Sequence, residues 1–302
     1  LVTKNGKVAY QGEQSMLDAA PTIAVIRKIL KTTYGRLAKK FSDAPDEAVV
    51  DAGVRNVFAD CWADANFKEQ TQKLLEDARQ HHLDLSSEFD LETVRFEDFG
   101  KKQVKQWGYD GPLFAQLSIQ LAAYRLFGEV VGCYEAASTR PFLHGRTETT
   151  RPVSPATVSF VKIMNDKEAS VSNKVPALDE AAFAIGEYQT MASSGKGVDR
   201  HLNGIFSMVQ EGEDTPELYS DPLFQRAKAF RLSTSSVVFT PGFGPVDEKG
   251  LGIGFNAEKD CFVYLVTSRK KNNYAGPFCE LIQQSLREMG ELLEAAQTKG
   301  TD

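Results

Sequence analysis

The amino-acid sequence predicts an α/β or α+β fold, and two observations lead to that prediction. Several segments place apolar residues at helical spacing, whereas two runs in the last hundred residues are rich in β-branched and aromatic residues. The chain shows no internal repeat. Its 302 residues are enough for one large domain or two modest ones. We therefore expect strands and helices packed together around one or two cores.

The first part of the chain is expected to contain a β-hairpin and two helices. Residues 1–10 alternate about an Asn-Gly pair, a strong signal for a β-hairpin. Residues 22–37 carry apolar side chains at helical spacing, and residues 67–81 are charged and helix-prone. The polar, proline-containing segment 40–51 between them is interpreted as a connector between domains.

The middle of the chain is expected to be mainly helical. Residues 113–134 are apolar almost all round, which is typical of a helix buried in a protein core. Residues 155–164 fit either a strand or the start of a helix, and residues 177–191 fit a helix. A short helical stretch is expected to follow residues 198–204.

The last hundred residues are expected to contain two strands and a final helix. Residues 232–240 and 261–268 are β-rich, and residues 277–296 form an amphipathic helical pattern. Five glycines lie between the two strands. They resemble a phosphate-binding loop, but the lysine-serine ending and the following helix are missing, so we do not interpret them as a P-loop.

Composition excludes several classes of protein. A net charge of −6 argues against a nucleic-acid-binding surface, and 42% hydrophobic with 25% charged residues is ordinary for a globular protein. The four cysteines lie far apart and are interpreted as buried thiols in a reducing compartment. The four histidines have no spacing suited to zinc, and we expect no membrane span.

Residues 134–154 form the most informative stretch of the chain. They follow the apolar helix and contain three arginines, Arg140, Arg146 and Arg151, among many serines and threonines. Guanidinium groups suit the fork-like capture of a carboxylate or phosphate. The stretch therefore indicates either a polar site on a rigid support or a solvated loop after a core helix.

The same stretch closely resembles the choline/carnitine acyltransferase family. That family has a Tyr-Glu-Ser/Ala-Ala-Ser pattern followed by Gly-Arg-Thr-Asp/Glu-Thr-Ile-Arg. Only the isoleucine differs in the second pattern, where this chain has Thr150. The matching residues are Tyr134, Glu135, Ala137, Ser138, Gly145, Arg146, Thr147, Glu148, Thr149 and Arg151.

The resemblance implies the coenzyme A-dependent acyltransferase fold, in which mixed sheets are covered by helices in two domains. It covers nearly all of this chain, and family members are much longer. The resemblance therefore implies that this chain corresponds to the C-terminal half and that the N-terminal half is missing. Residues 1–56 would end the first domain and residues 57–302 would form the second. Acyl-CoA and L-carnitine would meet in a tunnel between the domains.

The family's catalytic motif resembles Gly-Glu-His-Ser-Met-Leu-Asp-Gly, and here residues 12–19 read GEQSMLDA. Gln14 occupies the position of the histidine that acts as general base, and an amide cannot accept that proton. Asp18 matches the acid that orients the histidine, although the spacing alone fits a helix N-terminal acid equally well. Ser235 ends the Ser-Thr-Ser motif and would donate a hydrogen bond to the oxyanion.

The resemblance also implies a carnitine site. Arg200, in the Asp-Arg-His-Leu motif, matches the arginine that faces the carnitine carboxylate. Choline has no carboxylate with which this charge could pair. Phe243, in the Phe-Gly-Pro-Val motif, would pack near the trimethylammonium group. Tyr134, Thr147 and Ser233 are the other residues implied to bind carnitine.

For coenzyme A, the resemblance implies phosphate contacts from Lys101 and Lys105, which cluster beside Gly100, and a contact from Ser138. The family's Ser-Pro-Asp after the two lysines is replaced by Tyr-Asp-Gly-Pro. Coenzyme A is a substrate, so no cofactor, metal or prosthetic group is expected. The partners expected are acyl-CoA, L-carnitine or another alcohol, and the missing N-terminal half, with no nucleic acid.

The predicted function is reversible acyl transfer between coenzyme A and the hydroxyl of L-carnitine, impaired in this chain by Gln14. One alternative is an acyl-offloading domain of a multidomain synthase, such as a polyketide synthase. Another is an inactive acyltransferase-like protein that binds coenzyme A or acyl-carnitine. We expect an intracellular protein, whether mitochondrial, peroxisomal or cytoplasmic. Pro241 and Gly242, just before Phe243, are small and are expected to open the acyl pocket beyond acetyl.

Overall fold

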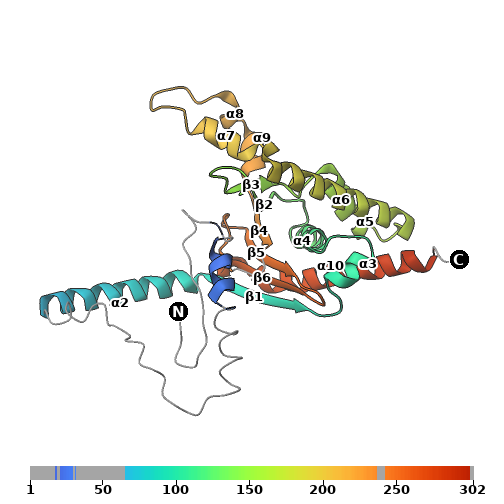
Figure 1. The fold of residues 1–302 in the computed structure, drawn as a ribbon, viewed down its shortest axis with the longest axis horizontal. Helices are drawn as coiled ribbons and strands as arrows, with labels where there is room; N and C mark the ends of the chain where they lie inside the picture. The colour runs from blue at the N-terminus through green and yellow to red at the C-terminus, as the bar shows by residue number, and fades with distance from the viewer. Residues whose placement is uncertain (1–17, 19–20, 30, 32–64, 237–241, 300–302) are drawn as a thin grey trace, which may run out of the picture. The chain divides into compact units, whose positions relative to one another are not determined.

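A computed structural model describes residues 18, 21–29, 31, 65–236 and 242–299 (Figure 1). The chain divides into two compact units, residues 1–87 and 88–302. The predicted hairpin, the connector and the predicted domain boundary at residue 56 lie outside the described residues and stay predictions.

In the first unit, residues 21–29 are helical, as the apolar spacing predicts, and α2 spans Ala65–Ser87. The helix predicted over residues 67–81 is therefore confirmed and is longer at both ends.

The second unit is built on one mixed, six-stranded sheet. Its strands are β1 (Phe89–Phe96), β2 (Cys133–Ser138), β3 (Thr147–Thr150), β4 (Leu232–Ser236), β5 (Leu251–Ala257) and β6 (Phe262–Arg269). They lie in the order β1-β6-β5-β4-β2-β3. Strand β4 runs parallel to both β2 and β5, and the other pairs are antiparallel.

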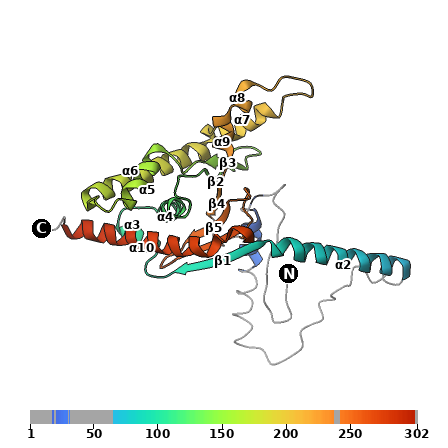
Figure 2. The same ribbon diagram turned by 180° about the vertical axis from the view of Figure 1, so that it is seen from behind.

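Helices cover one face of this sheet. The first layer contains α4 (Gly111–Phe127) and α10 (Ala275–Lys299), which pack on each other and on β5, β6 and β1 (Figure 2). Against α4 lie α3 (Lys101–Gln106), α5 (Pro155–Asn165) and α6 (Val171–Met191). The remaining helices are η2 (Ala192–Lys196), α7 (Asp199–Phe206), α8 (Glu217–Ser220), α9 (Pro222–Lys228) and the short η3 (Lys270–Asn272).

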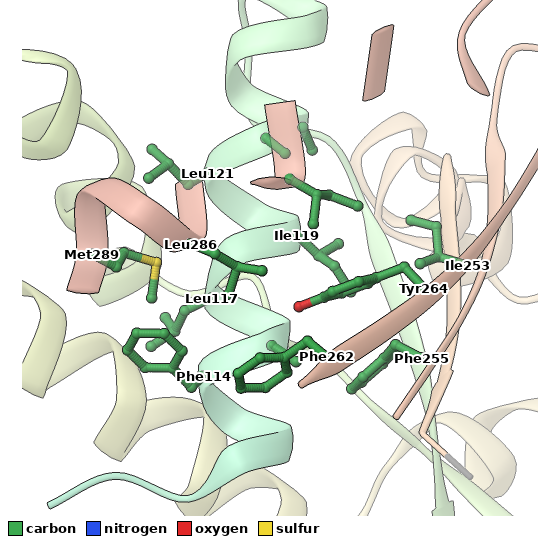
Figure 3. Close-up of a cluster of buried hydrophobic side chains, with 14 of the residues drawn as sticks. Phe114, Leu117, Ile119, Leu121, Ile253, Phe255, Phe262, Tyr264, Leu286 and Met289 are labelled. Atoms are coloured by element: carbon green, nitrogen blue, oxygen red, sulfur yellow. The ribbon is translucent and has the colours of Figure 1, made fainter. Parts of the chain in front are cut away.

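The core lies between this helical layer and the sheet. Helix α4 is buried along most of its length because the sheet, α10 and the α5–α6 pair surround it, which explains why its sequence is apolar almost all round. Figure 3 shows the contact between the layers. The side chains labelled there are Phe114, Leu117, Ile119 and Leu121 of α4, Ile253 and Phe255 of β5, Phe262 and Tyr264 of β6, and Leu286 and Met289 of α10.

Helix α4 ends earlier than the sequence predicts. It stops at Phe127, and Gly128 follows in a left-handed conformation with a φ angle of 71°. A glycine at this position ends a helix at little cost because it has no Cβ. Four residues follow, Glu129 to Gly132, and the chain enters β2 at Cys133. The prediction that Tyr134 lies on this helix is therefore wrong, because Tyr134 lies on a strand of the sheet.

Other elements confirm or complete the sequence predictions. Residues 155–164, which fitted either type of structure, are helical in α5. Strand β6 confirms the strand predicted over 261–268. Helices α6 and α10 confirm the helices predicted over 177–191 and 277–296. The predicted strand 232–240 is β4 as far as Ser236, and residues 237–241 are not described. Strands β1, β2, β3 and β5 were not predicted.

Candidate substrate-binding site

Strand register places five of the predicted site residues on one face of the sheet. Tyr134 on β2 lies opposite Ser233 on β4, Ser233 lies opposite Gly252 on β5, and Gly252 lies opposite Thr267 on β6. Residues in register across a sheet point to the same side. We call these four residues the site row and the side to which they point the site face.

Alternation along the strands adds further predicted residues to this face. Ser235 is two positions beyond Ser233 and opposite Gly254, and Ser138 is four positions beyond Tyr134, opposite Thr147. Glycines at 252 and 254 leave this part of the face without side chains. Ser233 is buried, Ser235, Tyr134 and Thr147 are half-buried, and Ser138 is exposed.

The guanidinium group of Arg200 joins two of the predicted carnitine residues. Its Nη2 donates to the Tyr134 hydroxyl at 3.3 Å and to Thr147 Oγ1 at 3.4 Å, and its Nε donates to the Thr147 carbonyl at 3.3 Å. The group is solvent-exposed, and its Cζ lies 6.0 Å from the centre of the Tyr134 ring. A cation and two hydroxyl groups therefore converge where a carboxylate could be bound.

A buried carboxylate holds the start of helix α7, which carries Arg200. Glu148 on β3 accepts a hydrogen bond from the Arg200 backbone N–H at 3.2 Å and another from the Thr149 N–H at 2.7 Å. Gly197 allows this approach, because a Cβ there would lie 2.2 Å from Glu148 Cγ. The helix itself begins at Asp199, so the Asp-Arg-His-Leu motif lies within α7 and not before a helix.

A charged pair fixes the same turn. Arg151 donates to both Asp199 carboxylate oxygens, at 2.9 and 2.6 Å, and to the Ala227 carbonyl at 2.7 Å. Its guanidinium lies 5.0 Å from the Phe230 ring, which contacts Tyr134 with ring centres 5.7 Å apart. The hydrogen bonds to Asp199 raise the pKa of Arg151. The sequence identified Arg151 and Asp199 only as members of two separate motifs. It did not predict their contact, because the motifs are far apart along the chain and only the fold brings them together.

Phe243 lies over the same face. Thr267 Oγ1 donates a hydrogen bond to the Phe243 carbonyl, and a Cβ on Gly252 would lie 2.3 Å from that carbonyl oxygen. Phe243 is half-buried. Four of the five predicted carnitine residues therefore lie on this face together with Ser235. Arg200, the fifth, contacts two of them, Tyr134 and Thr147.

The predicted coenzyme A residues are divided between two places. Lys101 and Lys105 are exposed on helix α3, one turn apart, so they lie on a helix and not on a flexible loop. The N–H groups of residues 101 and 102 donate to the β5–β6 turn at 2.9 and 3.0 Å, which leaves only the lysine side chains to reach a phosphate. Ser138 lies at the end of β2, and among the described residues no hydrogen bond joins it to either lysine.

The two other predicted catalytic residues, Gln14 and Asp18, belong to the first unit. Gln14 lies outside the described residues, and Asp18 is half-buried shortly before the helical residues 21–29. Their position relative to the site row therefore stays a prediction. Among the described residues, no cluster of histidine, cysteine or acidic side chains is arranged as a metal site.

Comparison with known proteins places this chain in a family. The family model described as Choline/Carnitine o-acyltransferase matches residues 1–284. The chain is 35% identical over 237 residues to the peroxisomal carnitine O-octanoyltransferase of Mus musculus and 30% identical over 264 residues to the mitochondrial carnitine O-acetyltransferase of Saccharomyces cerevisiae. These matches cover 74% and 84% of this chain but 39% and 38% of the relatives.

The choline O-acetyltransferase of Sus scrofa is also similar, at 30% identity over 238 residues, which is 76% of this chain and 37% of that protein. The chain belongs to the choline/carnitine acyltransferase family and spans about two fifths of the length of these relatives. Family membership and the mixed sheet covered by helices confirm the predicted fold class.

Comparison with solved structures finds matches at low TM-scores. Chloramphenicol acetyltransferase matches with a TM-score of 0.37 and 12% identity, over 66% of this chain and 88% of its own. The trichothecene 15-O-acetyltransferase TRI3 from Fusarium sporotrichioides matches with a TM-score of 0.39 and 13% identity, over 68% of this chain and 47% of its own. No helix among the described residues combines the length and apolar character needed to cross a membrane.

Proposed function

We propose that this chain binds acyl-CoA and L-carnitine for the transfer of an acyl group between the coenzyme A thiol and the carnitine hydroxyl. The observation that carries the proposal is the convergence of the Arg200 guanidinium with the Tyr134 and Thr147 hydroxyls on the site face. L-Carnitine has a carboxylate that these three groups can bind, whereas choline has none.

The other site residues have complementary roles in this proposal. The ring of Phe243 faces the trimethylammonium group, since an aromatic face attracts a cation. Ser235 donates a hydrogen bond to the oxyanion of the tetrahedral intermediate, and Lys101 and Lys105 bind phosphates of coenzyme A. The reaction needs a base and an oxyanion donor only, so we propose no metal or prosthetic group.

Gln14 favours a second candidate, binding without turnover. A neutral amide does not accept a proton from the thiol or the hydroxyl near pH 7, so the chain would bind both substrates and transfer the acyl group slowly or not at all. A thiol-release assay with acyl-CoA and L-carnitine distinguishes the two candidates, because both predict binding but only the first predicts steady release of coenzyme A.

The binding site itself is tested by comparing L-carnitine with choline. We expect Arg200→Asn to weaken L-carnitine by about 2–4 kcal/mol, because the bound carboxylate then loses its charged partner. Choline should lose much less. Calorimetry on the purified chain measures both affinities, with Arg226→Asn, at an exposed arginine of α9, as the matched control. Equal losses for the two ligands would exclude Arg200 as the carboxylate partner.

A further inference from the structure

The segment that carries Phe243 contacts the sheet through the buried side chain of Thr267. Residues 242–246 have no regular secondary structure, and the Phe243 carbonyl accepts a hydrogen bond from Thr267 Oγ1. The same hydroxyl lies 3.3 Å from the Gly252 carbonyl. Thr267 is 5% exposed, so this hydroxyl is shielded from water and its partners are within the protein.

Gly252 leaves the space in which this attachment is made. A Cβ at this position would lie 2.3 Å from the Phe243 carbonyl oxygen, 2.6 Å from Thr267 Oγ1 and 3.0 Å from the Gly244 carbonyl carbon. Any other residue at position 252 would therefore push the segment away from the sheet. Thr267 and Gly252 belong to the site row, which continues across the sheet to Ser233 and Tyr134.

We propose that Thr267 is a positioning residue that fixes the Phe243 ring against the cationic end of the ligand, with Gly252 providing the space. This inference rests on the proposed function, in which Phe243 faces the trimethylammonium group. The attraction between a cation and a ring depends on the cation lying over the ring face within about 6 Å. Loss of the hydrogen bond would let the segment and its ring move, so selectivity for a charged ligand would fall.

Two substitutions separate the hydroxyl group from the shape of the side chain. Thr267→Val keeps the shape and removes the donor, whereas Thr267→Ser keeps the donor. The ligands are L-carnitine and its analogue with a quaternary carbon in place of the nitrogen, which lacks the positive charge and keeps the carboxylate. The readout is the ratio of the two dissociation constants, measured by calorimetry, because general destabilisation of the fold weakens both ligands alike.

We expect the wild type and Thr267→Ser to prefer L-carnitine, which has the cationic group, over the carbon analogue by the same ratio. Thr267→Val should reduce that ratio by about 3- to 10-fold, and Phe243→Leu should reduce it further. In the Phe243→Leu background, Thr267→Val should have no additional effect on the ratio, since both changes act through one ring. An unchanged ratio in Thr267→Val would overturn the proposal.

A second measurement needs no ligand. Fluorophenylalanine labelling, with the Phe243 signal assigned from its loss in Phe243→Leu, reports the surroundings of the ring. Thr267→Val should shift or broaden this ¹⁹F signal and Thr267→Ser should not; an identical signal in all three proteins would show that Thr267 does not position the ring. A wild type that binds neither ligand would instead refute the proposed function, whatever the ¹⁹F spectra show.

Discussion

Tyr134 and Glu135 are adjacent in the chain and lie in opposite environments. Tyr134 points to the site face, whereas Glu135 points beneath the sheet and is only 4% exposed. It lies opposite Thr150 and Thr234, on the side where Gln116 of α4 donates to Cys133 Sγ at 3.3 Å. Burial raises the pKa of Glu135 to about 7. This carboxyl group is therefore partly protonated near neutral pH.

This environment predicts a pH dependence of stability. The folded pKa of Glu135 is raised, so the folded state binds the proton more tightly than the unfolded state, and stability is lost as the pH rises from about 4.5 to about 7. We expect Glu135→Gln to remove that loss and to stabilise the chain by up to about 3 kcal/mol at pH 8, with little effect at pH 4.5. Urea unfolding at both pH values measures the difference.

Glu180→Gln is the control, because Glu180 is exposed on α6 and the change should be small at both pH values. If Glu135→Gln gave the same change in unfolding free energy at pH 4.5 and pH 8, Glu135 would not titrate in the predicted range.

At the scale of elements, the end of α4 decides where β2 begins. Gly128 has a φ angle of 71°, and a Cβ added there would meet open space, so the cost of a side chain comes from the backbone alone. We expect Gly128→Ala to destabilise the second unit by about 1 kcal/mol.

Gly204, inside α7, also has open space, and Gly204→Ala should instead be neutral or stabilising by up to about 1 kcal/mol. Denaturant midpoints with equal slopes measure both changes, and a loss of equal size at the two positions would contradict this account.

Strands β6 and β1 border the position that is expected to control acyl length. A side chain at Gly242 would meet Leu265 at 3.2 Å and Leu91 at 3.7 Å, so its absence leaves room between these residues. If the acyl chain enters this space, each added methylene contributes up to about 0.8 kcal/mol until the space is filled. We expect the site to accept chains longer than acetyl and Gly242→Met to shift the preference back to acetyl. Binding of acyl-CoAs from acetyl to palmitoyl tests this, and a wild-type optimum at acetyl with a steep fall by hexanoyl would contradict it.

At the scale of the whole molecule, the predicted chemistry is divided between the two units. Gln14 and Asp18 belong to residues 1–87, whereas the site face belongs to residues 88–302. We expect Gln14→His, in the longest form of the protein that the gene encodes, to raise acyl transfer by about two to four orders of magnitude. A coenzyme A release assay measures the gain, with Gln14→Asn as a control that also lacks a base. A rate no higher than that of Gln14→Asn would show that position 14 does not hold the base.

The sequence alone predicted the helices best where the pattern was long and periodic, as in α2, α6 and α10. It missed β5, because glycines at 252 and 254 remove the side chains by which a strand is usually recognised. It also continued α4 through Tyr134, because an apolar run does not distinguish a buried helix from a buried strand.

For the site, the sequence determined which residues form the motifs and therefore the family, because motifs are short and local. Only the tertiary structure decided that Tyr134, Ser233, Gly252 and Thr267 form one row, and that Arg200 reaches the first of them. These positions are far apart along the chain and belong to four strands and a helix. Their meeting depends on strand register, and a shift of one residue would turn a strand's side chains to the opposite face.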